Sequence, residues 1–323
     1  MRNNAQLLML DAHAAESLLT IDSVLAATAR AFELHRLREA RMFPVIRESL
    51  NTGGVFGIKA GDMQSESLLG FKAAGFWPSN HALGGESHQA TVILIDPASG
   101  RPKCIIDGNA ITTMRTGAAG GLGLRALARP DSQRLCVFGK GVQARIQVTF
   151  ALHLMPGIES VRYLTSDRMA DARFESYFRG QCKIAHASDA DEAVAASDIV
   201  ITATPGRGPL FNADAVQPGT HINCVGADTK GKRELPEGLL DRARLFVDDR
   251  IQTAQIGETQ WQPAADCTEL GEVLADPSKL TRRREDITVF DMTGLALQDL
   301  TVAQMMQERA LEQDIGTRIA WPW

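Results

Sequence analysis

The strongest constraint on the fold is a regular alternation, after residue 134, between short apolar runs and helix-length segments. Such an alternation predicts a mostly parallel sheet with helices on both faces, which is a doubly wound α/β arrangement. Seven runs are predicted as strands that complete this sheet, and they read RLCVFG, SVRYLT, CKIAHA, SDIVITAT, GTHINCVGA, RARLFVDD and DITVFDMTG.

A glycine pattern after the first of these strands indicates a dinucleotide site. Gly139, Gly141 and Ala144 form Gly-x-Gly-x-x-Ala between a strand and a helix. Glycines at such a turn let the backbone approach a pyrophosphate, which rests on the helix N-terminus. A turn that merely joins strand to helix is the alternative, and the alternating pattern argues against it. The helix is expected against the sheet because apolar residues recur every four positions, at Val142, Ile146, Phe150 and Leu154.

The cofactor is predicted to be NAD or NADP, because the end of the second strand leaves the choice open. Asp167 could bind the ribose hydroxyls of NAD, or it could cap the next helix. Ser166 and Arg168 could instead hold the 2′-phosphate of NADP. Lys140 is expected to add charge near the phosphates, with a solvent-facing side chain as the alternative. The predicted cofactor contacts are Gly139, Lys140, Gly141, Val142, Gln143, Ala144, Ser166, Asp167, Arg168, Thr202, Thr204, Val225, Gly226, Thr293 and Gly294.

The first third of the chain has a different pattern, with a helix pair expected around residues 21–39, followed by strands and hairpins. The clearest hairpin is ATVILIDPASGRPKCIIDG, whose turn lies at residues 96–100. Residues 109–127 are expected to form a helix capped by Asn109. Its four glycines, which would cost an exposed helix roughly 3–4 kcal/mol relative to alanine, imply that other backbone packs closely against it. The segment LALQDLTVAQMMQERALEQ is expected to be a helix that returns to the first domain.

Composition excludes several classes of protein. The chain has 323 residues and a formal net charge of -5, and it shows no basic run interleaved with aromatics, so nucleic acid is not an expected partner. The five cysteines are far apart and are expected to be free thiols, and no ligand spacing predicts a metal site. The N-terminus has no long apolar segment, so neither a signal peptide nor a membrane span is expected, and the predicted location is cytoplasmic.

Several motifs, in the right order along nearly the whole chain, resemble the ornithine cyclodeaminase and mu-crystallin family. They are HQATVILIDPASGRPKCIIDGNAITTMRTGAAGGLG, GKGVQA, GTHINCVGADTKGKREL and FDMTGLALQDL. The resemblance implies a Rossmann dinucleotide-binding domain, residues 119–296, inserted into a smaller α+β domain, residues 1–118 and 297–323. That smaller domain would bind the substrate and form a homodimer. The family includes cyclodeaminases, alanine dehydrogenases and imine reductases.

The resemblance also implies site residues. Arg47, Lys72 and Arg115 are carried over as cations for the substrate carboxylate, and Asp228 and Lys72 as catalytic residues. A guanidinium pairs a carboxylate bidentately, although any one basic residue could serve only surface solubility. Asp228 would exchange a proton with the substrate nitrogen, with a turn aspartate as the alternative. Thr293 and Gly294 would lie near the nicotinamide, with a helix N-cap as the alternative.

Within the family, the chain resembles the iminosuccinate reductases, which make L-aspartate. The segments FPVIRE, GFKAAGFWPSN, QIGE and DTKGKREL carry this likeness. The predicted function is therefore NAD(P)H-dependent reduction of an α-imino acid, with iminosuccinate as the expected substrate. Because iminosuccinate has two carboxylates, Lys59 and Lys230 are candidates for a second contact, with an ordinary surface role as the alternative. The other functions considered are a cyclodeaminase lyase with catalytic NAD, an alanine dehydrogenase, a cyclic ketimine reductase and non-catalytic binding.

Overall fold

The computed structural model describes residues 5–321 and divides the chain into two compact units. The first unit comprises Met1–Arg115 and Leu295–Trp323, and the second comprises Thr116–Gly294. The fold class predicted from the sequence, a Rossmann-type doubly wound α/β domain inserted in the sequence of a smaller α+β domain, is confirmed.

The first unit is built on a mixed sheet of eight strands. Its strand order is β16-β1-β7-β6-β5-β4-β2, with β3 paired to β4, and β1 and β7 are the parallel pair among antiparallel neighbours. The strands are β1 (Gln6–Leu10), β2 (Ala40–Met42), β3 (Ile46–Ser49), β4 (Val55–Met63), β5 (Leu68–Phe76), β6 (His88–Ile95), β7 (Pro102–Asp107) and β16 (Thr317–Ala320).

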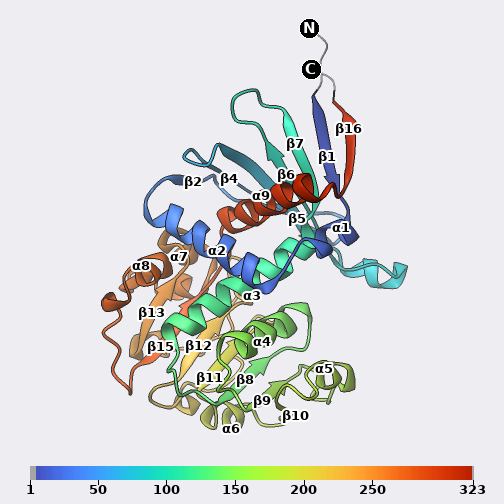
Figure 1. The fold of residues 1–323 in the computed structure, drawn as a ribbon. Coiled ribbons are helices and arrows are strands. Elements are labelled where there is room, and N and C mark those ends of the chain that lie inside the picture. Colours follow the sequence, from blue (N-terminus) through green and yellow to red (C-terminus); the bar gives the residue numbers. More distant parts are fainter. Residues whose placement is uncertain (1–4, 322–323) are drawn as a thin grey trace. The chain divides into compact units, whose positions relative to one another are not determined.

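Two long helices, α2 (Ile21–Arg36) and α9 (Ala296–Gln313), pack on each other, and α9 lies across β4, β5 and β6 (Figure 1). Thr20 and Ser23 form a capping box at the start of α2. The expected helix pair around residues 21–39 is wrong: α2 is one uninterrupted helix, and the short α1 (Ala12–Ser17) precedes it. The unit also contains the short helix η1 (Pro78–Leu83).

The C-terminal helix returns to the first unit, as the sequence predicted. After α9, the chain adds strand β16 antiparallel to β1, which was not predicted. A four-residue strand with every side chain exposed carries no hydrophobic alternation that a sequence pattern could reveal. The last two residues of the exposed-looking segment IAWPW lie outside the described residues.

The second unit has eight parallel strands in the order β10-β9-β8-β11-β12-β15-β13-β14. The expectation of seven strands is wrong because β14 has three residues, too few to show a pattern. The strands are β8 (Arg134–Phe138), β9 (Ser160–Leu164), β10 (Lys183–His186), β11 (Ile199–Thr202), β12 (His221–Cys224), β13 (Ala243–Val247), β14 (Cys267–Glu269) and β15 (Ile287–Asp291).

Helices cover both faces of this sheet. Leu135 and Val137 of β8 contribute to one core, and Cys136 and Phe138 contribute to the other, because successive strand residues point to opposite faces. The helices and short 3₁₀ segments of this unit are α4 (Val142–Leu154), α5 (Ala172–Tyr177), α6 (Ala190–Ala195), α7 (Arg250–Ile256), α8 (Leu270–Ala275), η2 (Ala213–Ala215), η3 (Leu240–Arg242), η4 (Glu258–Trp261) and η5 (Pro277–Lys279).

Helix α3 (Gly108–Leu127) contains residues of both units, and two expectations about it need correction. Asn109 is not its N-cap, because Asn109 lies inside the helix and the side chain of Asp107 accepts from the Asn109 and Ala110 amides at 3.1 and 3.5 Å. The four glycines of the expected helix, Gly117, Gly120, Gly121 and Gly123, do face close neighbours, but these are side chains rather than backbone. A Cβ on Gly117 or Gly123 would lie 2.5 Å from the ring of Phe150 or Phe290.

The described part of the chain, residues 5–321, contains no helix with the length and apolar character needed to cross a bilayer.

Replacing Gly120 with alanine tests the packing against α3. The new Cβ would lie 2.0 Å from Oε1 of Gln147, whose amide donates to the Thr116 carbonyl at 2.7 Å. We expect Gly120→Ala to lower the free energy of unfolding by about 1–3 kcal/mol, measured by urea denaturation. The control Gly157→Ala, at an exposed position with no close neighbour, should change it by less than about 0.5 kcal/mol. Equal effects of the two substitutions would contradict the packing described here.

Candidate active-site residues

A buried charge cluster lies at the start of α9 in the first unit. Asp299 Oδ1 accepts from Lys72 Nζ at 2.8 Å and from Arg115 Nε at 3.1 Å. The Lys72 side chain is 5% exposed and the Asp299 side chain is fully buried. Thr112 Oγ1 lies 3.2 Å from Lys72 Nζ, and Gln298 Oε1 accepts from Arg115 Nη1 at 3.2 Å. The structure therefore brings together two of the three predicted cations around one carboxylate.

Burial and neighbouring charges shift the pKa values of this cluster. The pKa of Lys72 is lowered to about 7, chiefly by burial; the charges of Arg115 and Lys59 act in the same direction, and Asp299 opposes them. Burial alone would raise the pKa of Asp299, but Lys72 and Arg115 bring it below its ordinary value. His88, whose Nδ1 lies 3.0 Å from Asn109 Oδ1, has a pKa lowered by burial and then by Lys72. Two cations share one acid, so the cluster carries net positive charge when Lys72 is protonated.

Strand register places two further cations on the same sheet face as Lys72. Lys59 of β4 is directly opposite Lys72 of β5, and opposite residues of an antiparallel pair point to the same side. Arg47 of β3 is opposite Gly57, two residues before Lys59, so Arg47 points to that side as well. Arg47 is exposed and Lys59 is half-buried. The face thus carries a row of cations that becomes more buried toward Lys72.

In the second unit, the turn after β8 fits a dinucleotide pyrophosphate. Gly139 has a φ of 115°, and a Cβ there would lie 2.6 Å from the Ala203 carbonyl oxygen, so only glycine fits. Gly141 begins α4 without a side-chain cap, and a Cβ there would meet nothing within 4 Å. The first amides of α4 therefore adjoin open space, which is the arrangement that a helix N-terminus uses to bind a phosphate.

Lys140, within the same turn, lies beside two aspartates. Its Nζ is 2.8 Å from Asp167 Oδ2 and 3.6 Å from Asp171 Oδ2. This contact lowers the pKa of Asp167, chiefly through the hydrogen bond from Lys140. Asp167 is not a helix cap, because α5 is capped by Asp171, whose Oδ1 accepts from the Arg173 and Phe174 amides. Because Lys140 offsets the negative charge of Asp167, the end of β9 is compatible with the ribose hydroxyls of NAD and with the 2′-phosphate of NADP.

The loops after β11 and β12 carry the next predicted residues. Thr204 donates its amide and its hydroxyl to Glu234 Oε1 at 2.8 and 2.6 Å, and Gly226 donates its amide to Glu234 Oε2 at 2.9 Å. Thr202 ends β11, and its carbonyl accepts from the Val225 amide at 2.9 Å. These contacts fix two adjacent loops at the carboxyl edge of the parallel sheet, where ligands of doubly wound folds bind.

Asp228 follows β12 on the second of these loops. Its Oδ1 accepts from Thr229 Oγ1 at 3.1 Å and lies 3.6 Å from Lys232 Nζ. The side chain is 40% exposed, so a small molecule can reach it. A reachable carboxylate beside a lysine can exchange a proton with a bound amine or imine.

Thr293 and Gly294 follow β15 and are held by hydrogen bonds within the second unit. Thr293 Oγ1 donates to Asp248 Oδ1 at 3.1 Å, and the Gly294 amide donates to Asp248 Oδ2 at 2.5 Å. Gln252 Nε2 contacts Thr293 Oγ1 at 2.7 Å and Gly294 O at 3.0 Å. Thr293 is not the N-cap of α9, because Leu295 occupies that position.

Sequence reasoning missed the acids that organise these groups. Asp299 is the sole acid in the apolar run LALQDLTVA, and Asp248 directly follows the strand run RLFV, so a signal for each of these two acids was present in the sequence. Glu234 is buried, but it lies in the polar segment GKREL, whose sequence does not indicate this burial. A buried acid costs several kcal/mol unless it is paired, so an acid in an apolar run indicates a cation nearby.

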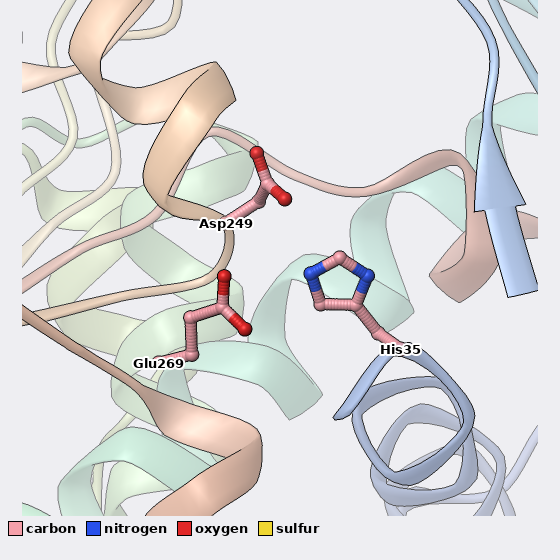
Figure 2. Close-up of side chains that lie close together, drawn as sticks. All are labelled: His35, Asp249 and Glu269. Carbon is pink, nitrogen blue, oxygen red and sulfur yellow. The ribbon is translucent and has the colours of Figure 1, made fainter. Parts of the chain in front are cut away.

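Two more acids lie near the start of α7 (Figure 2). Asp249 Oδ1 caps this helix by accepting from the Gln252 amide at 2.6 Å, and Glu269 Oε1 accepts from the Arg250 amide at 3.4 Å. Figure 2 also labels His35 of α2, which belongs to the first unit. The prediction that the chain binds no metal stays a prediction.

Comparison with known proteins gives consistent matches over nearly the whole chain. The description "Ornithine cyclodeaminase/mu-crystallin family" belongs to the family model that matches residues 5–314. The iminosuccinate reductase of Paracoccus denitrificans is 33% identical, covering 94% of this chain and 96% of its own. Its crystal structure with NAD+ has a TM-score of 0.89 at 32% identity, with 98% and 99% coverage.

Two further solved structures are similar. An archaeal alanine dehydrogenase dimer with bound NAD has a TM-score of 0.91 at 32% identity, covering 98% of this chain and 100% of its own. The Δ1-pyrroline-2-carboxylate reductase of Thermococcus litoralis, in complex with NADH and L-proline, has a TM-score of 0.87 at 27% identity. The match covers 97% of this chain and 100% of that one.

The lowered pKa of Lys72 predicts a pH-dependent affinity for carboxylates. Lys72 is charged below pH 7 and loses its proton as the pH rises through about 7. The dissociation constant of oxalate, which is fully ionised throughout, should therefore rise above this pH by up to about tenfold per unit, measured by calorimetry. Lys72→Arg should remove this dependence because arginine stays protonated. Lys103→Arg, on the exposed side of β7, should keep it. If the dissociation constant of oxalate for the unmodified protein did not change from pH 6 to pH 9, the role of Lys72 would be contradicted.

Proposed function

The chain belongs to the ornithine cyclodeaminase/mu-crystallin family, and from that premise we propose that it reduces iminosuccinate to L-aspartate. The family resemblance predicted from the sequence is confirmed. The protein is an NAD(P)-dependent oxidoreductase that acts on imines, and its cofactor is NAD or NADP. Iminosuccinate as the substrate, the roles of single residues and the role of each unit are parts of the proposal.

In this proposal, Lys72 and Arg115 bind the α-carboxylate of the substrate, and Arg47 adds a third contact from the exposed end of the same face. Asp299 holds the two buried cations at 2.8 and 3.1 Å, so neither has to be ordered when substrate binds. Fixed charges in a buried site interact more strongly with an anion than they would in water. Lys72 is also proposed as a catalytic residue, because below pH 7 its positive charge would act on the bound imino acid.

The observation that carries the choice of iminosuccinate is the position of Lys59 opposite Lys72. A substrate with a second carboxylate would find a second cation one strand away from the first. Ornithine would bring a positively charged side-chain amine toward Lys59, and charges of the same sign repel. An imine of pyruvate or proline has no second carboxylate to bring to Lys59. The dianion is therefore the substrate that this row of cations favours.

Asp228 is proposed to give the substrate nitrogen its proton. Reduction consumes one imine, one NAD(P)H and one proton and yields one amine and one NAD(P)+. When bound, the nicotinamide supplies the hydride that reaches the imine carbon. Asp228 then supplies the proton at nitrogen, and Lys232, 3.6 Å away, stabilises the carboxylate that remains.

A homodimer in the cytoplasm is also part of the proposal, and the first unit offers a surface for it. The face of its sheet away from Lys72 carries half-exposed apolar side chains, at Phe56, Ile58, Phe71, Ile93 and Ile105. Met9, on neighbouring β1, is 40% exposed. An apolar sheet face of this kind is typical of a protein–protein interface. The similar archaeal alanine dehydrogenase is a dimer.

Substrate preference tests the proposal. We expect the protein to oxidise NADH or NADPH with iminosuccinate, formed from oxaloacetate and ammonia, at a higher kcat/KM than with pyruvate and ammonia. Lys59→Met should lower kcat/KM for iminosuccinate by roughly 10- to 100-fold, because a charged hydrogen bond is lost. The same variant should leave the pyruvate reaction nearly unchanged.

Lys183→Met, which removes an exposed lysine from β10 of the second unit, is the matched control and should alter neither reaction. Equal losses for both substrates in Lys59→Met would count against the second carboxylate contact. Ammonia release from ornithine without net consumption of NAD(P)H would favour the cyclodeaminase alternative, and a preference for pyruvate would favour an alanine dehydrogenase.

A further inference from the structure

Glu234 is a buried acid whose two carboxylate oxygens are both used to hold backbone. Oε1 accepts from the amide and the hydroxyl of Thr204, and Oε2 accepts from the Gly226 amide at 2.9 Å. The residue itself is 0% exposed. Thr204 follows β11 and Gly226 follows β12, so a single carboxylate joins the loops after two neighbouring strands.

The fit around this carboxylate is tight. A Cβ on Gly226 would lie 2.3 Å from Oε2 and 2.4 Å from the carboxyl carbon of Glu234. Any side chain at residue 226 would therefore displace the acid, and Gly226 is required by close approach. Thr204 Oγ1 also accepts from the Gly206 amide at 3.1 Å, which extends the same network along the β11 loop.

Glu234 is itself held in place by η4. The Glu234 amide donates to Glu258 Oε1 at 2.6 Å. The Gln260 side chain accepts from the Gly231 amide at 2.6 Å and donates to the Lys232 carbonyl at 3.2 Å. The Trp261 indole donates to that same carbonyl at 3.2 Å. The segment from Gly226 to Glu234, which contains Asp228, is thus fixed at both of its ends and along its length.

We propose that Glu234 is a positioning residue that sets the conformation of the β11 and β12 loops, and through them the cofactor contacts of Thr204 and Gly226 and the placement of Asp228. Three donors converge on one carboxylate, and a neutral amide cannot accept from all three, since its NH₂ group would face a donor. The statement about Asp228 rests on the proposed function, whereas the statement about the cofactor rests on the family's use of NAD or NADP and on the predicted cofactor contacts of Thr204 and Gly226.

A measurement of cofactor binding without substrate tests the statement about the cofactor separately from the statement about Asp228. We expect Glu234→Gln to raise the dissociation constant of NADH, or of NADPH if that is the tighter ligand, by tenfold or more, measured by fluorescence titration of the full-length protein. Glu237→Gln removes an exposed acid three residues away and should leave the constant within twofold of the unmodified value. Because no imino acid is present, failure of the iminosuccinate assignment would not affect this result.

A pair of substitutions at Thr204 tests the same network if Glu234→Gln does not fold. Thr204→Ser keeps the hydroxyl donor to Glu234 and Thr204→Val removes it, so the serine variant should bind the dinucleotide at least fivefold more tightly than the valine variant. For Asp228, a folded Glu234→Gln should show a displaced pH profile of kcat with any accepted imine. A folded Glu234→Gln with unchanged dinucleotide affinity and pH profile, or Thr204 variants of equal affinity, would overturn the proposal.

Discussion

The carboxylate of Asp299, shared by Lys72 and Arg115, is the interaction on which the proposed substrate site depends. Burying Lys72 and Arg115 without a counter-charge would cost several kcal/mol for each, and Asp299 offsets that cost by accepting from both. One acid cannot neutralise two bases, so the cluster retains an affinity for another anion. Placing this acid in the first turn of α9 also explains why a C-terminal helix must return to the first unit, since the cations are contributed by β5 and α3.

The second unit also contains buried acids that hold neighbouring groups in place, at the carboxyl edge of its parallel sheet. Glu234 accepts from the loops after β11 and β12, and Asp248 accepts from Thr293 and Gly294 after β15. In each case a buried acid is satisfied by backbone amides and hydroxyls rather than by a cation. The acids thus fix the loops, while the space around Gly141 at the start of α4 stays open. Glu234 and Asp248 are therefore structural anchors for residues that we propose as cofactor contacts.

Much of the fold could be predicted because its long elements have strong periodic patterns, as in the strand and helix on either side of Gly139 and the hairpin before Gly108. Elements too short to show a period, β14 and β16, were missed. The cap of α3 was assigned to Asn109 because asparagine is a common N-cap. The side chain of Asp107, at the end of β7, instead accepts from the first amides of the helix. Lys72, Arg115 and Asp228 were predicted as site residues from the resemblance, and their roles stay predictions. Asp299 and Glu234 were not assigned: an acid in an apolar run indicates burial, but the groups that satisfy it are set by tertiary contacts that no local pattern encodes.

The central claim is that the cations held by Asp299 bind the substrate carboxylate, and the most direct measurement is calorimetric titration of L-aspartate into protein saturated with NAD+ or NADP+. Arg115→Gln removes one cation and leaves the Lys72–Asp299 pair in place. The account predicts that this variant, folded as judged by circular dichroism, binds L-aspartate about 30-fold or more weakly than the unmodified protein, since a buried charge contact is lost. An affinity that stays within twofold would contradict it.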